Sequence, residues 1–229
     1  MSLNYFTSLF DFFLPRLCVS CKTKLTTSEK YICQECLSKL EHPSKTRLEN
    51  EFKRKFLNDK IISDFASTYI FYKDSVIQDL IHSLKYDKQF LVGKYLGQQI
   101  TNNLKDKILS WNASLIIPVP LHTLRKAERG FNQAEKIANA IGKTLNIPTD
   151  TKTLKRSRFT ETQTKLTLVE RKKNMNKAFI LKTTKNIQGK TIILVDDVIT
   201  TGATFAECGK VLLNNGANKI YALSVAIAE

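Results

Sequence analysis

Residues 191–204 read Thr191-Ile-Ile-Leu-Val-Asp-Asp-Val-Ile-Thr-Thr-Gly-Ala-Thr204. The four apolar residues from Ile192 to Val195 predict a fully buried strand of a parallel sheet. Two carboxylates, Asp196 and Asp197, follow where we expect that strand to stop, and a short turn then leads into a helix. Because ligands of open α/β sheets bind at the carboxyl ends of the strands, the pattern predicts a binding site here.

The turn after this strand has the chemistry of an anion site. Its hydroxyl groups and the backbone N–H groups at the helix start can bind a phosphate, and its glycine lets a ligand approach the backbone. The two carboxylates can hold vicinal hydroxyl groups of a sugar. The alternative is a buried strand with an acidic N-cap and threonines that only fill the turn. We predict a sugar-phosphate site formed by Asp196, Asp197, Thr200, Thr201, Gly202, Ala203 and Thr204.

Strand and helix patterns alternate through the rest of the chain. Further strands are expected at residues 65–72, 114–120, 178–181 and 219–228, and helices at 75–84, 91–104, 131–145 and 201–214. Pro118 cannot donate to a ladder, so its strand should stop there, and Gly216 should cap the last helix. The alternation predicts an α/β fold with a doubly wound, mostly parallel sheet.

The composition limits the class of protein. The chain has 229 residues, 42% of them apolar, which is enough for one substantial core and a small satellite domain. A formal net charge of +15 favours polyanionic partners such as nucleic acid, phosphorylated metabolites or acidic lipid. A lysine-rich genome that spreads positive charge over all its proteins is the alternative, so the charge alone assigns no partner.

Four cysteines form two Cys-x-x-Cys pairs, Cys18 with Cys21 and Cys33 with Cys36. Two such pairs suit one tetrahedral Zn²⁺ held by four thiolates, which leaves no open position for catalysis. Disulfides, a redox pair and an iron–sulfur cluster are the alternatives. We predict a structural zinc module, and we expect the isolated Cys208 to be a core thiol.

The first 14 residues are apolar, but they lack the positive start and the small-residue cleavage site of a secretory signal. No apolar run reaches the ~18 residues of a transmembrane helix. We therefore expect a short amphipathic helix, no stable membrane insertion and a cytoplasmic location. Residues 1–60 should hold this helix, the zinc module and an exposed, charged helical connector, and residues 61–229 should form the α/β domain.

Two basic segments are candidates for binding a pyrophosphate. Residues 118–133 join a strand to a helix and carry Arg125 and Arg129 beside a glycine; a solvated basic turn is the alternative. Residues 152–185 contain eleven Lys or Arg and two Glu. They can form a cationic lid over a leaving group, or they can bind the backbone of single-stranded nucleic acid.

The combination of motifs resembles the ComF family of competence proteins, which join a four-cysteine zinc module to a type I phosphoribosyltransferase domain. The matching strings occur in family order over nearly the whole chain. Besides the cysteine pairs they are Ile81-His-x-Leu-Lys-Tyr86, Pro118-Val-Pro-Leu-His122, Arg129-Gly-Phe-Asn-Gln133, Arg158-x-Thr-x-x-Gln163, Arg171-x-x-Asn174 and Asp196-Asp-Val-x-Thr-Thr-Gly-Ala-Thr204.

The resemblance implies a ligand, phosphoribosyl pyrophosphate (PRPP), together with Mg²⁺. Asp196 and Asp197 would bind the ribose hydroxyls, and residues 200–204 would hold the 5-phosphate. The pyrophosphate would face Arg125 and Arg129, the catalytic lid would contain Arg158 and Gln163, and the acceptor pocket would include Lys85 and Tyr86. The family is linked to DNA uptake in natural transformation, with a cytoplasmic helicase as a partner.

Three functions stay open at this point. The protein can transfer phosphoribose to a nitrogen nucleophile, it can handle incoming single-stranded DNA, or it can sense PRPP without turnover. An intact ligand site is compatible with all three functions, because a fold and its binding site can be retained after catalytic activity is lost.

Overall fold

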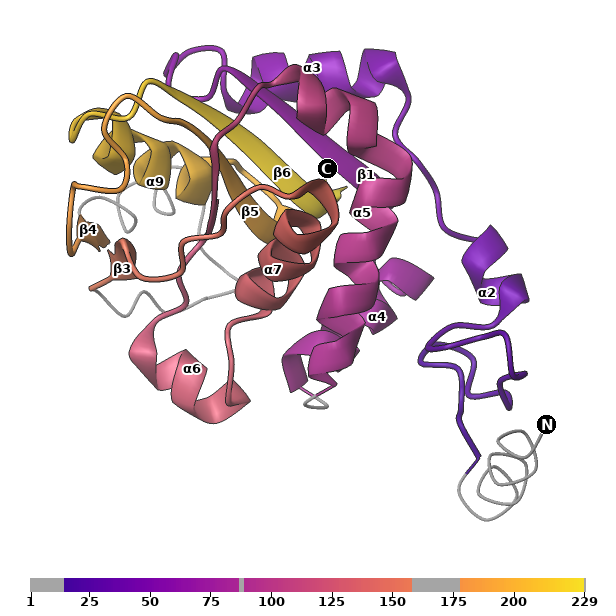
Figure 1. The fold of residues 1–229 in the computed structure, drawn as a ribbon. Coiled ribbons are helices and arrows are strands. Elements are labelled where there is room, and N and C mark those ends of the chain that lie inside the picture. The colour runs from indigo at the N-terminus through magenta and orange to yellow at the C-terminus, as the bar shows by residue number, and fades with distance from the viewer. Residues whose placement is uncertain (1–14, 87–88, 158–177, 229) are drawn as a thin grey trace.

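The computed structural model describes residues 15–86, 89–157 and 178–228, and its centre is one parallel four-stranded sheet (Figure 1). The strand order is β1-β6-β5-β2, and every neighbouring pair is parallel. A short antiparallel pair, β3-β4, lies beside it. The strands are β1 (Asp64–Phe71), β2 (Leu115–Pro118), β3 (Leu154–Arg156), β4 (Phe179–Leu181), β5 (Thr191–Ile199) and β6 (Lys219–Ala228).

Helices cover both faces of the sheet, which confirms the predicted doubly wound α/β architecture. Alternate residues of β5 belong to different cores: Ile193 and Val195 pack with the α4, α5 and α7 side, whereas Ile192 and Leu194 pack with the α3 and α9 side. The helices are α2 (Gln34–Ser38), α3 (Lys45–Lys55), α4 (Val76–Tyr86), α5 (Phe90–Ser110), α6 (Thr123–Arg129), α7 (Gln133–Leu145) and α9 (Ala203–Leu213). None of these described helices is long and apolar enough to cross a membrane.

Two expected ends of elements were wrong. Strand β5 does not stop before Asp196 but continues to Ile199, because Asp196 pairs with Ser224 and Ile199 pairs with Ile227 of β6. The last helix ends at its C-cap Asn214, and Gly216 takes up its left-handed conformation (φ 100°) two residues later. Strand β2 ends at Pro118, as predicted.

The segment expected to be an exposed connector contains α3, and one face of α3 is buried. The ring of Phe56 is 1% exposed and lies 5.7 Å from the ring of Phe65 in β1, centroid to centroid. Phe52 stacks on the same Phe65 at 6.2 Å. The expectation of full exposure was therefore wrong, because apolar residues at helical spacing attach α3 to the sheet. The domain boundary at residue 60 stays a prediction.

The cysteine-containing segment packs against the helices of the α/β domain. Val19, Leu25 and Ile32 belong to the same apolar cluster as α4 and α5, and the rings of Tyr31 and Tyr95 lie 5.5 Å apart. The hydroxyl of Ser20 also donates a 2.6 Å hydrogen bond to Asp79 of α4. This segment is thus anchored to the domain. The amphipathic helix expected at residues 1–14 lies outside the described residues.

Candidate functional site

A cavity of ≈ 200 Å³ lies at the carboxyl ends of β2 and β5. Parallel strands bring their carboxyl ends to the same edge, so side chains far apart in the sequence meet there. The charged and polar residues that line it come from α4, α6, α7, α9, β3 and β5: Lys85, Arg125, Arg129, Gln133, Arg156, Asp196, Asp197 and Thr204.

The predicted acid pair and the predicted arginines Arg125 and Arg129 meet in this cavity. Of the predicted turn, Thr204 lines it, whereas Thr200, Thr201, Gly202 and Ala203 form the adjoining part of the chain. Arg158 and Gln163, the expected lid residues, lie outside the described residues.

Gln133 and Arg156 also line the cavity. Both lie in the predicted basic segments, but neither was predicted individually as a site residue. The spacing of Gln133 from Arg129 was a usable signal, because the two side chains contact each other. The basic segment 152–185 indicated Arg156 only as one cation among eleven, because its position in the cavity depends on the pairing of β3 with β4.

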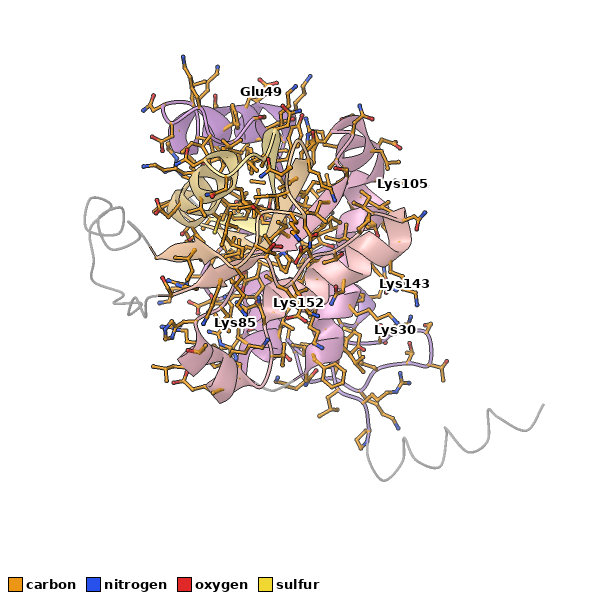
Figure 2. All side chains as sticks on the ribbon, turned by 60° about the vertical axis from the view of Figure 1, so that its left-hand side comes forward. Lys30, Glu49, Lys85, Lys105, Lys143 and Lys152 are labelled. Carbon is orange, nitrogen blue, oxygen red and sulfur yellow. The ribbon has the colours of Figure 1, made fainter. Side chains whose placement is uncertain are left out.

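The two aspartates occupy different electrostatic environments. Asp197 is 5% exposed, and its Oδ2 lies 2.5 Å from Nζ of Lys85 (labelled in Figure 2). Burial alone would raise the pKa of Asp197, but the Lys85 ammonium outweighs it and the pKa is lowered. Burial and the neighbouring Asp197 charge both raise the pKa of Asp196. The site therefore holds one carboxylate as a firm anion and one that resists ionisation.

The turn that follows β5 has its backbone fixed at Gly202. This residue has φ 77° and is the N-cap of α9, and the Thr201 hydroxyl accepts a 3.3 Å hydrogen bond from the N–H of Ala203. A Cβ on Gly202 would lie only 2.6 Å from Cε1 of Phe56. Both the backbone conformation and the close approach of α3 thus require glycine at this position.

The basic side of the cavity is ordered by hydrogen bonds and stacking. Arg129 is buried, donates from Nη1 to Oε1 of Gln133 at 3.1 Å, and lies 5.2 Å above the ring centre of Tyr86. Asn132 donates to the Val119 carbonyl at 3.0 Å and so attaches the start of α7 to the end of β2. His122 caps α6 by accepting from the N–H of Leu124 at 3.3 Å, which gives it a local structural role.

A larger cavity of ≈ 700 Å³ lies between α3, β1 and α5. Of its two acidic lining residues, Glu49 and Asp64, the second is engaged by Lys107 Nζ at 2.5 Å and by Trp111 Nε1 at 3.0 Å. Many of its other lining residues are apolar, among them Leu48, Phe52, Leu57 and Phe65. We place the candidate site at the smaller cavity, because it joins two buried groups of opposite charge, Asp197 and Arg129, at the carboxyl ends of the strands.

The four N-terminal cysteines have the arrangement of a tetrahedral metal site. Their Sγ atoms all lie within 4.8 Å of one another, and Cys21 and Cys33 are 3.5 Å apart. Zn–S bonds of about 2.3 Å place neighbouring sulfurs about 3.8 Å apart, so the cluster fits one Zn²⁺. Backbone N–H groups already point at the sulfurs: Cys33 donates to Cys18 at 3.4 Å and Cys36 donates to Cys33 at 3.5 Å. These four residues can bind zinc.

Cys208 is a buried core thiol, as predicted, and burial raises its pKa.

Comparison with known proteins identifies the family. A sequence profile described as "Phosphoribosyl transferase domain" matches residues 118–227. Competence protein F of Haemophilus influenzae is 31% identical over 216 residues, which cover 93% of this chain and 90% of the relative. DNA utilization protein YhgH of Escherichia coli (strain K12) is 33% identical over 144 residues, 62% of this chain and 63% of the relative. Competence protein ComFC of Bacillus subtilis (strain 168) is 25% identical over 202 residues, 88% of this chain and 79% of the relative. The chain belongs to the ComF family and carries a type I phosphoribosyltransferase domain.

Proposed function

We propose that the cavity binds PRPP. The ribose lies at Asp196 and Asp197, with the 5-phosphate on one side of them and the pyrophosphate on the other. The observation that carries this proposal is that one cavity joins Asp196 and Asp197 to Arg125 and Arg129. Carboxylates accept hydrogen bonds from vicinal hydroxyls, and guanidinium groups bind phosphate oxygens in a bidentate manner. Residues 200–204, at the start of α9, receive the 5-phosphate.

Mg²⁺ enters this proposal with the ligand. The ion prefers oxygen ligands and keeps several waters, so pyrophosphate and ribose oxygens carry it and the protein adds little direct coordination. When bound, it neutralises negative charge on the pyrophosphate.

We propose transfer of the phosphoribosyl group to a nitrogen nucleophile. A bond forms between that nitrogen and C1 of the ribose, and the C1–O bond to pyrophosphate breaks with its electron pair going to the pyrophosphate. The nitrogen loses its proton to the departing pyrophosphate or to water. Arg125 and Arg129 stabilise the negative charge that grows on the leaving pyrophosphate. Arg158 and Gln163 belong to the lid that excludes water in this proposal. PRPP binding without pyrophosphate release from any base or nucleic acid would instead favour a sensing role.

The ligand assignment is tested by thermal unfolding. PRPP with Mg²⁺ should raise the melting temperature of the wild-type protein, because a ligand that binds only the native state stabilises it. The double variant Asp196→Asn, Asp197→Asn should lose this shift while it still unfolds cooperatively. An unchanged wild-type melting curve at millimolar PRPP would reject the assignment.

We further propose that the cysteine cluster holds one structural Zn²⁺. The four thiolates leave no open coordination position, so the ion stabilises the segment and takes no part in catalysis. Elemental analysis of protein purified without added metal should give about one zinc per chain. A ratio near zero would reject the proposal.

A second candidate function is binding of single-stranded DNA, as a step in DNA uptake. The names of the relatives, which refer to competence and DNA utilization, point to it. The specific observation is two cation–ring pairs: Arg129, which lines the cavity, over Tyr86, and Lys136 5.6 Å from the ring centre of Phe90. These two rings are 58% and 50% exposed, so bases can stack on them.

Binding of a fluorescent oligonucleotide tests this function. Affinity should fall steeply with added salt, because Lys and Arg displace counterions from the phosphates. The variant Tyr86→Ala should bind less tightly than the control Leu57→Ala, which removes an exposed apolar side chain that lines the larger cavity. No binding at low salt would reject the DNA function. We also propose that the protein is cytoplasmic and that its partner in DNA uptake is a helicase. Co-purification of the helicase with the protein from competent cells tests the partner.

A further inference from the structure

Lys55, the last residue of α3, has a buried ammonium group that contacts two distant parts of the chain. Its side chain is 4% exposed. Its Nζ donates to the main-chain carbonyl of Thr200 and, at 3.1 Å, to the carbonyl of Ala228. Burial lowers the pKa of Lys55, and Glu51, whose Oε2 lies 3.0 Å from Nζ, favours the charged form.

The next residue touches the same turn from the same side. The ring of Phe56 lies against Gly202, so closely that a Cβ at Gly202 would meet it at 2.6 Å. The end of α3 therefore supports the turn after β5 at two successive points, at the carbonyl of Thr200 and at the Cα of Gly202. Neither contact belongs to the cavity that lies at the end of this strand.

The contact with the Thr200 carbonyl fixes the orientation of a whole peptide group. In a planar trans peptide the C=O and the following N–H point in opposite directions. Because Lys55 holds the carbonyl of Thr200 toward α3, the N–H of Thr201 points away from α3. A charge-assisted hydrogen bond to the carbonyl also polarises the peptide and makes its N–H a stronger donor.

We propose that Lys55 is a positioning residue for the 5-phosphate: it presets the peptide of Thr200 and Thr201 so that its N–H faces the anion. This inference rests on the PRPP site proposed above and adds a residue outside that site. It also gives α3 a function, since the segment that follows the cysteine module then sets the geometry of the ligand turn.

The test uses the full chain and three variants. Lys55→Met keeps the length and the apolar stem but removes the donor, and Lys55→Gln keeps a shorter donor. Lys53→Met is the control, because Lys53 is an exposed lysine on the same helix. Each variant is measured by backbone ¹⁵N relaxation without ligand and by titration with ribose 5-phosphate and with pyrophosphate.

In Lys55→Met, the order parameters of Thr201 and Gly202 should fall from about 0.85 to below about 0.6. Ribose 5-phosphate should bind about tenfold more weakly, as expected for loss of one charge-assisted contact, while pyrophosphate affinity stays unchanged. Lys55→Gln should lie between Lys55→Met and the wild type, and Lys53→Met should match the wild type. Lys55→Gln decides the case if Lys55→Met does not fold.

Two results would overturn the inference: a turn that stays rigid in the folded Lys55 variants, or an equal loss of affinity for both ligands. If the wild type bound neither ligand, the PRPP proposal would fail, and the relaxation data alone would still decide whether Lys55 orders the turn.

Discussion

In the proposed PRPP site, the two sides of the cavity would bind an anion by different physical means. On the β5 side, the turn at residues 200–204 offers backbone N–H groups and hydroxyls, and its shape is fixed by Gly202 and by the buried end of α3. On the α6 side, Arg125 and Arg129 offer full positive charges on long side chains. The first side depends on backbone geometry and the second depends on charge.

This difference predicts which kind of substitution weakens ligand binding on each side. A change in backbone shape should damage the turn and leave the arginines intact. Removal of an arginine charge should damage the arginine side and leave the turn intact. Added salt should weaken pyrophosphate binding more than binding of the 5-phosphate, because screening acts on full charges.

The largest expected effect is that of Gly202→Ala on stability. The turn forces the new alanine into a positive φ that a Cβ disfavours, and this Cβ meets the ring of Phe56, so we expect a loss of roughly 3 kcal/mol in the free energy of unfolding. Gly189→Ala is the matched control: Gly189 also has a positive φ (64°), but no atom lies within 4 Å of its added Cβ. The control should lose about 1 kcal/mol. Urea unfolding measures both, and equal losses would mean that α3 does not constrain the turn.

The next effect is that of Arg129→Met on ligand affinity. We expect about a hundredfold loss for PRPP and for pyrophosphate, and no change for ribose 5-phosphate, since the lost contact is a charged hydrogen bond to phosphate. Lys126→Met removes a more exposed charge from the same helix α6 and should have a small effect. Calorimetric titration gives the affinities. If Lys126→Met matched Arg129→Met, the α6 side would act through its general positive field and not through a placed guanidinium.

The smallest effects are those of substitutions at the two aspartates. We expect these substitutions to change the free energy of unfolding in opposite directions. Asp196→Asn should raise it by about 1 kcal/mol, because it removes a charge disfavoured by burial and by Asp197. Asp197→Asn should lower it by about 2 kcal/mol, because it leaves Lys85 without its anion.

The pH dependence follows from the same two pKa shifts. The lowered pKa of Asp197 contributes stability that is present above the unfolded-state pKa of about 4 and is lost as the pH falls through the folded-state pKa. The raised pKa of Asp196 has the opposite sign: stability falls as the pH rises from about 4 through the folded-state value. Urea unfolding at pH values from about 3 to about 8 should show the fall in stability that Asp196 causes in the wild type. The variant Asp196→Asn should not show this fall. A parallel pH profile for the two proteins would contradict this assignment of charge.

Local sequence patterns were sufficient for the sheet, the cysteine cluster and the acid pair. The β-branched run before Asp196, the proline at the end of β2 and the Cys-x-x-Cys spacing each predict their structure without knowledge of distant residues. The structure confirms the sheet and brings the four sulfurs together.

Contacts between distant residues were not predictable from the sequence. Strand β5 extends to Ile199 because of its pairing with β6, and this pairing depends on the register of two separate segments. Lys55 looked like one of many surface lysines, and its burial depends on a carbonyl 145 residues away. The Lys85–Asp197 ion pair likewise joins α4 to β5, so both residues were predicted as site residues but their contact was not.

The most direct test of the central claim is a calorimetric comparison of PRPP, ribose 5-phosphate and pyrophosphate in the presence of Mg²⁺. If one ligand spans the turn and the arginines, PRPP should bind at least about a hundredfold more tightly than either fragment, because linked contacts act without a second loss of translational freedom. PRPP that binds no more tightly than pyrophosphate would contradict the claim, because the acid pair and the turn would then contribute nothing to recognition.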